Sequence, residues 1–464
     1  MAVCATAVAA SCGDDGTSNG GLADAPPGGG KLDAGDGTPP PVTLTVTRNG
    51  APVEGVHTYF LNPDHTVAAT VDTDATGTAT AALPLGGTVT AIDPFPHLVA
   101  TVLRTLAAAP VIIGDNELRT FAGVKPGDHL VLGRNDKTVS FTLRLPQSEP
   151  LADQYQVATP CGGGFAFPGG GGGGSDATPG GSFQLTGCPA KLDIAVVAIA
   201  NGRTVGALVH PAAEINSDGV VDLTGDAYAA ATTRQFAYPN APDIAITTAH
   251  TLVSASGAFG PFGPAGGMQV SIDEPAIAGA TGITDAQIRL NGTHHVIDAG
   301  PLAATTSTDL TGQLLPDFNG QPGYNPTNHL VTWIEDTQNL AVLHGQTADL
   351  TITALDVSRE NRVWHWTVAA PYAPGKVEFP TLPTDLADWS PNFETDGITV
   401  SELINVKLPG GYDQARAHIF DVNDALGNGS LAALATGITG RVVAVEAGRN
   451  VAAAGARTAT QPRR

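Results

Sequence analysis

Short runs of alternating apolar and polar residues, separated by turn residues, constrain this chain most strongly. Residues 42–47, Val-Thr-Leu-Thr-Val-Thr, alternate with a period of two, which predicts a strand with one buried face. An Asn-Gly pair follows at 49–50, and such a pair is typical of a tight hairpin turn. Further Asn-Gly pairs at 201–202 and 291–292 predict two more hairpins. The pattern therefore favours an all-β fold of short strands.

Composition supports the same fold class and excludes some partners. The chain holds 57 glycines and 35 prolines among 464 residues, which suits many turns better than long helices. The formal net charge is −22, and such acidity repels phosphate backbones, so we expect no nucleic-acid partner. No run of apolar residues is long enough for a membrane-spanning helix, which needs about 18 or more.

The N-terminal residues point to a membrane anchor. Residues 8–16, Val-Ala-Ala-Ser-Cys-Gly-Asp-Asp-Gly, resemble the lipobox of bacterial lipoproteins. The resemblance implies cleavage before Cys12, a lipid on its sulfur, and attachment of the protein to a membrane through that lipid. Residues 1–11 are then a signal peptide, and because no Lys or Arg precedes their apolar stretch, we expect its charged region upstream of the recorded start. A buried free cysteine is the alternative.

The segment after this cysteine has the composition of a stalk. Residues 12–41 are rich in Gly, Pro and Asp and contain no aromatic residue, so they cannot bury enough apolar surface to order themselves. We expect a lipidated Cys12 followed by a disordered stalk, in an exported protein of the bacterial cell envelope. Gly13 stands where inner-membrane lipoproteins of enterobacteria carry a retention Asp, which favours the outer membrane.

The first folded segment resembles a known domain family. Gly50-Ala-Pro-Val-Glu-Gly-Val56, Thr73-Asp-Ala-Thr-Gly77 and Leu83-Pro-Leu-Gly86 follow one another in an order that resembles carboxypeptidase regulatory-like domains. The resemblance implies a small prealbumin-like or immunoglobulin-like β-sandwich at 42–147. Such domains are grouped with carbohydrate-binding-like sandwiches, a likeness of fold alone. No peptidase motif accompanies it.

The remaining strands predict further domains of the same class. We predict tandem immunoglobulin-like or prealbumin-like β-sandwiches, with a second one at 155–235 and one or two further β-rich domains at 236–447. Short helices are expected at 382–389 and 415–426, and residues 448–464 form a basic tail.

Two cysteines lie in the second domain. Cys161 and Cys188 remain after Cys4 and Cys12 are assigned to the N-terminal segment, and an exported protein favours their pairing as a disulfide. The alternative is a pair of zinc ligands, but no histidine or second cysteine pair lies nearby.

Two turns cluster oxygen ligands of the kind that Ca²⁺ prefers. These candidate ligands are Asp72 and Asp74 in the first turn and Asn216, Asp218 and Asp222 in the second. The alternative is that Asp and Asn simply serve as turn residues, because their side chains bond the local backbone. We expect no other cofactor.

The run Val363-Trp-His-Trp-Thr367 is the sharpest candidate for ligand binding. On a strand Trp364 and Trp366 share one face, and two such indoles can stack on sugar rings. The alternative is that both tryptophans fill the core while His365 and Thr367 face water.

No motif identifies an enzyme. The sequence lacks the G-x-S-x-G and H-E-x-x-H signatures. His294 and His295, next to the 291–292 turn, are expected on opposite faces of an exposed hairpin shoulder. We therefore predict a cell-envelope lipoprotein with a non-catalytic binding or structural role toward a glycan or protein ligand. The alternative is an exported hydrolase with its site in 240–440 and the first sandwich as an accessory domain.

Overall fold

The computed structural model describes most of the chain beyond the N-terminal segment. The described residues are 39–93, 117–134, 138–169, 178–186, 188, 191–215, 219–255, 257–359, 362–415, 438 and 440–447. The predicted lipidation site, signal peptide and basic tail, and most of the predicted stalk, lie outside them. So does the predicted helix at 415–426, except for its first residue, which ends α1 (Gly411–Ala415).

The local predictions at the first strand are confirmed. In β1 (Val42–Arg48) buried and partly exposed residues alternate over its first six positions. Asn49 and Gly50 both have positive φ and connect β1 to β2 (Ala51–Pro52), as a tight hairpin turn requires. At the next turn, Gly77 has φ +73°, and a Cβ there would lie 2.4 Å from the carbonyl oxygen of Val46. Only glycine fits at that point.

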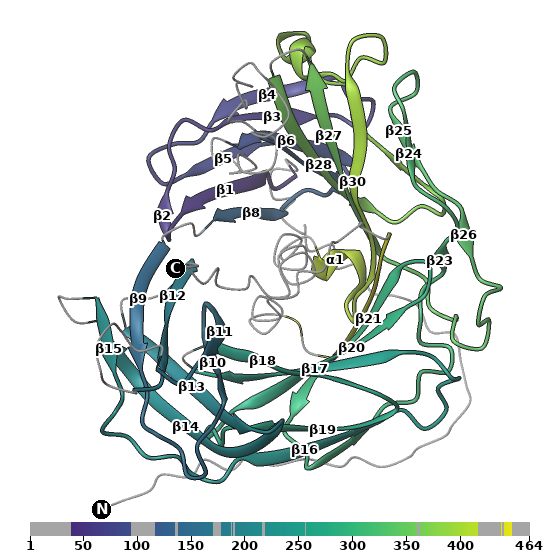
Figure 1. Ribbon diagram of the computed structural model, residues 1–464. Coiled ribbons are helices and arrows are strands. Elements are labelled where there is room, and N and C mark those ends of the chain that lie inside the picture. The colour runs from purple at the N-terminus through teal and green to yellow at the C-terminus, as the bar shows by residue number, and fades with distance from the viewer. Residues whose placement is uncertain are drawn as a thin grey trace, which may run out of the picture. The chain divides into compact units, whose positions relative to one another are not determined.

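The fold is all-β, and most of its parts are joined by one 12-stranded sheet (Figure 1). In spatial order its strands are β18 (Gly257–Gly266), β17 (Ile246–Ser254), β20 (Thr281–Arg289), β21 (Thr293–Pro301), β31 (Gly440–Glu446), β30 (Gly397–Lys407), β27 (Leu350–Arg359), β28 (Arg362–Pro371), β7 (Glu117–Val124), β6 (Gly87–Asp93), β3 (His57–Leu61) and β4 (Val67–Asp72). Strands from both ends of the folded segment thus share one hydrogen-bonded ladder.

Smaller sheets complete the architecture. They are β2-β1-β5 with β8 beside β1, β11-β10-β13-β14, β12-β9-β15, β19-β16-β22, β23-β26 and β24-β25-β29. Their remaining bounds are β5 (Thr78–Ala81), β8 (His129–Arg134), β9 (Thr138–Arg144), β10 (Gln154–Thr159), β11 (Gly162–Ala166), β12 (Gly180–Thr186), β13 (Lys191–Ala200), β14 (Arg203–Glu214), β15 (Val220–Asp222), β16 (Thr232–Ala237), β19 (Gln269–Glu274), β22 (Thr305–Ser307), β23 (Asp317–Phe318), β24 (Gly323–Asn325), β25 (Leu330–Thr332), β26 (Glu335–Asp336) and β29 (Lys376–Glu378).

Sheets pack face to face over separate cores. One core joins β1 and β8 to the large sheet through Leu44, Leu130 and Phe60. Another joins β16 and β19 to β17 and β20 through Phe236 and Leu252, and these strands lie side by side in Figure 1. A third core fills the space between the β10-β13 and β9-β12 sheets. This layering is the sandwich packing that the alternating strands predicted.

Strand pairing crosses both of the predicted domain boundaries. β9 lies within the predicted first domain but pairs with β12 and β15 of the second. β7, also of the first, pairs in parallel with β28 of the last segment. Whether 42–147 and 155–235 fold independently stays a prediction, while their strands complete shared sheets.

Two further local predictions concern turns and helices. The 201–202 and 291–292 pairs connect β13 to β14 and β20 to β21, as predicted. A 3₁₀ helix, η2 (Thr384–Trp389), occupies the segment where a short helix was expected. Within the described ranges, no helix has the length and hydropathy required to cross a bilayer.

Candidate functional site

The predicted pair of stacking tryptophans lies inside the protein, which corrects the ligand-stacking prediction. Trp364 is 2% exposed and Trp366 is fully buried. Trp366 donates from Nε1 to Thr120 Oγ1 at 3.0 Å and contacts Phe379 edge to face. Because neither ring presents a face to solvent, neither can stack on a sugar at the surface. The core alternative holds for both tryptophans, but Thr367 is also buried rather than facing water.

Trp364 nevertheless leads to the most extensive polar network around this strand. The guanidinium carbon of Arg359, at the end of β27, lies 5.1 Å from the centre of the Trp364 ring, within cation–π range. The Trp364 Nε1 donates to the carbonyl oxygen of Trp389 at 3.1 Å, and the two indoles meet edge to face. Trp364 thus supports both the guanidinium and the end of η2.

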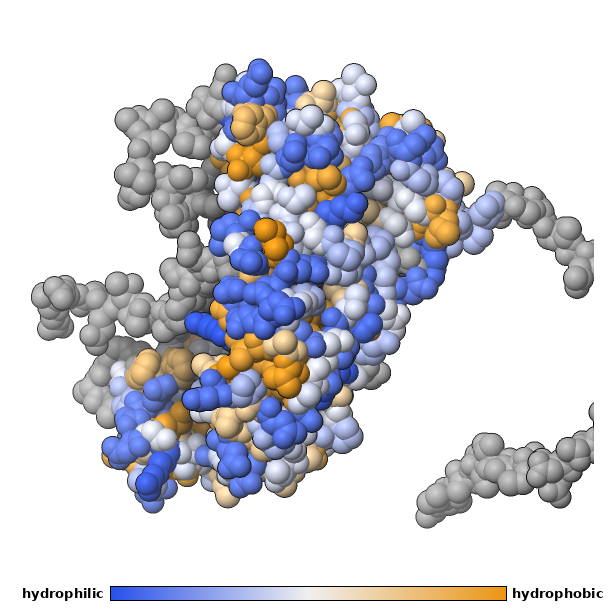
Figure 2. Space-filling model, turned by 90° about the vertical axis from the view of Figure 1, so that its right-hand side faces the viewer, coloured by the Kyte–Doolittle hydropathy of each residue, from blue (hydrophilic) through white to orange (hydrophobic). Residues whose placement is uncertain are grey.

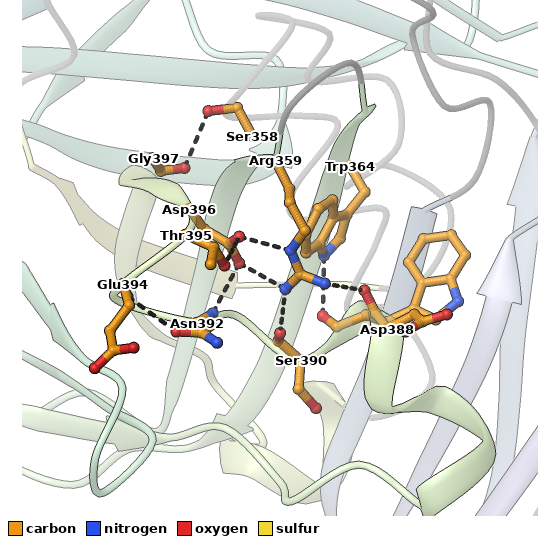
Figure 3. Close-up of polar contacts among 11 residues, drawn as sticks. Ser358, Arg359, Trp364, Asp388, Ser390, Asn392, Glu394, Thr395, Asp396 and Gly397 are labelled. Carbon is orange, nitrogen blue, oxygen red and sulfur yellow. Dashed lines mark hydrogen bonds and ion pairs between the residues drawn. The ribbon is translucent and has the colours of Figure 1, made fainter.

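Arg359 donates four hydrogen bonds to the loop that follows η2 (Figure 3). Its Nε and Nη2 donate to the two carboxylate oxygens of Asp396 at 2.6 and 2.7 Å. Its Nη1 donates to the carbonyl oxygen of Asp388 at 3.0 Å, and Nη2 also donates to that of Ser390 at 2.8 Å. A bidentate Arg–carboxylate pair fixes direction as well as distance. We call residues 388–397, held in this way, the clamped loop.

The carboxylate of Asp396 closes the loop from its other end. It accepts hydrogen bonds from the backbone N–H of Asn392 at 2.7 Å and from the hydroxyl of Thr395 at 2.8 Å. Burial alone would raise the pKa of Asp396, but Arg359 and these hydrogen bonds hold it below its usual range. The group therefore stays ionised at neutral pH and keeps its partners.

The tip of the clamped loop presents an aromatic side chain to solvent. Phe393 is 77% exposed, more than any other large hydrophobic residue in the described part of the chain. Its neighbours Asn392 and Glu394 are joined by a hydrogen bond from the Glu394 N–H to Asn392 Oδ1 at 2.9 Å. An exposed aromatic on a fixed backbone is suited to inserting into a partner, because little conformational entropy remains to be lost. The signal in the sequence that we missed is an aromatic residue directly after the turn residues Ser-Pro-Asn at 390–392.

The candidate calcium ligands that the structure describes each contact neighbouring protein groups. Asp72 contacts His57, whereas Asp74 accepts hydrogen bonds from Thr76 and Thr78 of its own turn. Asp222 accepts from the N–H and hydroxyl of Thr224 in the same manner. Asn216 and Asp218 lie outside the described residues. In the part of the chain that is described, no group of three or more His, Cys, Asp or Glu residues is arranged to hold a metal ion.

The disulfide prediction is confirmed. Cys161 and Cys188 are bonded, with their Cα atoms 5.1 Å apart. Both cysteines pack against the core between β10 and β12. The bond closes a 27-residue separation across the glycine-rich segment, and in the chain-entropy model closing such a loop destabilises the unfolded chain by about 3.5 kcal/mol.

The histidine pair is not an exposed shoulder, because β21 is an inner strand of the large sheet, paired with β20 on one edge and β31 on the other. His294 and His295 are both buried. His294 Nε2 lies 3.3 Å from Asp317 Oδ1, and His295 Nδ1 lies 3.1 Å from Asp285 Oδ2. Burial lowers the pKa of His294. Burial would also lower the pKa of His295, but Asp285 and Glu446 raise it above the usual value.

Comparison with known proteins does not assign this chain to a family. No protein-family profile matches the chain, and no curated protein matches it. An alignment with the Bacillus anthracis TIE protein covers 59% of this chain and 47% of that one, at 11% identity and a TM-score of 0.15. One with E. coli alpha-2-macroglobulin in its native conformation covers 78% and 26%, at 8% identity and a TM-score of 0.11. Each alignment spans under two thirds of the other chain, and neither supports any argument about fold or function.

Proposed function

We propose that this protein is an exported, lipid-anchored lipoprotein of the bacterial cell envelope that binds a protein partner through the clamped loop. The role is non-catalytic: the loop offers a contact surface rather than reacting groups. The single observation that carries the binding role is Phe393, 77% exposed on a backbone fixed by Arg359 and Asp396.

The export part of the proposal is supported by the disulfide and by the N-terminal sequence. Disulfides form in oxidising compartments and are rare in the cytosol. The Cys161–Cys188 bond therefore suits a protein that leaves the cytoplasm. The lipobox-like residues around Cys12 supply the anchor in this proposal, and residues 13–41 supply the spacer.

The binding part is supported by the exposure of Phe393 at the tip of a loop. On the face drawn in Figure 2, hydrophobic residues form separate groups among hydrophilic ones, as on most soluble surfaces. A large aromatic at a loop tip adds exposed apolar area that folding alone does not require. Aromatic residues are enriched at the centre of protein–protein interfaces, where they fill pockets of the partner.

The charges beside Phe393 indicate the chemistry of the partner. Asp388 and Glu394 are exposed acidic residues on the clamped loop, whereas the charge of Asp396 is already paired with Arg359. We therefore expect a protein partner with an apolar pocket rimmed by Lys or Arg, since opposite charges across an interface favour the encounter.

Site-specific photo-crosslinking in intact cells tests this role. A photoreactive phenylalanine analogue at position 393 should give one discrete adduct. The same analogue at Leu151, which is also a highly exposed hydrophobic position, should give none. In the protein that carries the analogue at position 393, Glu394→Lys should reduce the amount of adduct by about tenfold, which corresponds to about 1.4 kcal/mol of binding free energy. Equal adducts from positions 393 and 151, or no adduct at 393, would contradict the binding role.

A separate experiment tests the anchor. Metabolic labelling with an alkyne fatty acid should label the wild-type protein and fail to label Cys12→Ser. The same substitution should move the protein from the membrane fraction to the soluble fraction. Cys4→Ser is the matched control and should leave both results unchanged. Equal labelling of Cys12→Ser and wild type would contradict lipidation at Cys12.

A further inference from the structure

A pocket of about 130 Å³ lies between the small sheet β19-β16-β22 and one face of the large sheet. None of its lining residues belongs to the clamped loop. Phe236 of β16 and Thr306 of β22 line one side, and His250 of β17 and Thr284 of β20 line the other. An engineered cavity of about 150 Å³ accommodates one benzene ring, so this slightly smaller pocket cannot enclose a whole sugar, but because it is open on one side it can take part of one ring.

A row of polar residues crosses the large sheet at the floor of this pocket. The strand register places His250 opposite Thr284, Thr284 opposite Asp298, and Asp298 opposite Arg441. Directly opposed residues share a face of the sheet, so all four point to the same side. Arg441 donates to both oxygens of Asp298 at 2.7 and 2.8 Å, which fixes the carboxylate that lines the pocket.

The imidazole of His250 is held from behind by a buried carboxylate. Its Nδ1 lies 2.5 Å from Oε2 of Glu274, which is fully buried, and Arg234 Nε donates to Oε1 of the same carboxylate at 2.7 Å. An ionised carboxylate can only accept hydrogen bonds, so Nδ1 is the donor of this bond when Glu274 is charged. A neutral imidazole in this arrangement has its lone pair on Nε2.

Nε2 of His250 is the atom that this arrangement leaves available. His250 is 3% exposed and lines the pocket, and Nδ1 is the ring nitrogen that bonds Glu274. Gly282, another lining residue, lies directly beside it: a Cβ on Gly282 would come within 2.5 Å of Nε2. Glycine at this position therefore keeps the space next to Nε2 open.

We propose that this pocket binds one edge of a single small sugar or polyol ring, with a ligand hydroxyl hydrogen-bonded to Nε2 of His250. The lining supplies hydrogen-bond acceptors: Nε2, the Asp298 carboxylate and the hydroxyls of Thr284 and Thr306. It also supplies apolar walls from Phe236 and Leu302. The charges of Glu274 and Asp298 are balanced by Arg234 and Arg441, so a neutral ligand rich in hydroxyl donors is favoured over an ion.

Imidazole ¹⁵N NMR of the full protein tests the proposal at the atom concerned. D-glucose, D-galactose and N-acetyl-D-glucosamine serve as probes, each titrated separately. At least one should shift the Nε2 resonance of His250, because hydrogen bonding changes the shielding of that nitrogen. If none of the three shifts it, the proposal is wrong.

Two variants locate the binding and one controls for substitution. Gly282→Ala places a methyl group against Nε2 and should weaken binding at least about tenfold. His250→Gln keeps a polar side chain of similar length but loses the ring acceptor, and it should weaken binding similarly. Gly323→Ala, where a Cβ meets nothing within 4 Å, should leave affinity unchanged. A probe that binds both pocket variants as well as wild type would place the ligand elsewhere and overturn the proposal.

Discussion

The clamped loop and the His250 pocket are both built on an arginine paired with a fully buried carboxylate, and they differ in what the pair holds. Arg359 and Asp396 direct their remaining hydrogen bonds to backbone groups and a hydroxyl of their own loop. Arg234 and Glu274 instead hold an imidazole whose second nitrogen faces a pocket. The first pair fixes the shape of a surface, and the second orients one atom. The same ion pair thus serves two kinds of recognition.

Removing the carboxylate of the pocket pair should have the largest effect on stability. Glu274→Gln keeps the shape but leaves Arg234 without its buried counter-charge. Because Glu274 is fully buried, we expect a loss of about 4 kcal/mol in the free energy of unfolding, measured by urea denaturation. A loss below about 1 kcal/mol would show that the pair is effectively solvated, as exposed pairs are.

Breaking the clamp should cost less, because Arg359 is partly exposed. Arg359→Met leaves Asp396 buried without its cation, and we expect a loss of about 3 kcal/mol. The same variant should make 390–396 sensitive to limited proteolysis, whereas Glu274→Gln should not. Lys191→Met, which removes an exposed ion pair with Glu214, is the control and should leave both readouts unchanged. Equal protease resistance of wild type and Arg359→Met would show that Arg359 does not hold the clamped loop in its conformation.

The pKa values of the two adjacent histidines should be shifted in opposite directions. This is the smallest of the expected effects. NMR titration should find the pKa of His295 above, and that of His294 below, the usual value near 6.5. The contribution of His295 to stability is present below the unfolded-state pKa and is lost as pH rises through its folded pKa. Because His294 is buried in its neutral form, the protein loses stability as pH falls from the unfolded-state pKa of this residue toward its lower folded-state pKa. Matching pKa values for both would contradict the structure.

Much of the local structure could be predicted because its causes are local. The Val42–Arg48 alternation and the Asn-Gly turns depend on neighbouring residues, and the structure confirms them. The disulfide followed from the cysteine count, and it too is confirmed. Carboxypeptidase regulatory-like identity and lipidation of Cys12 stay predictions.

What could not be predicted depends on pairings distant in sequence. β28 pairs with β7, far earlier in the chain, and Trp366 bonds to Thr120 across that pair. The burial of His294 likewise depends on distant residues, since Asp317 and His344 contact its ring. Arg359 meets Asp396 only because β27 and β30 are neighbours. No periodicity within a strand carries such information.

The order parameters of the backbone amides from 392 to 396 test the central claim most directly. If Arg359 and Asp396 fix the loop around Phe393, these amides should have order parameters near 0.85, about the same as those of β27. The N–H of Asn392, which donates to Asp396, should also exchange slowly with solvent. Values below about 0.6 for 392–396 would show a mobile loop and contradict a pre-organised contact surface.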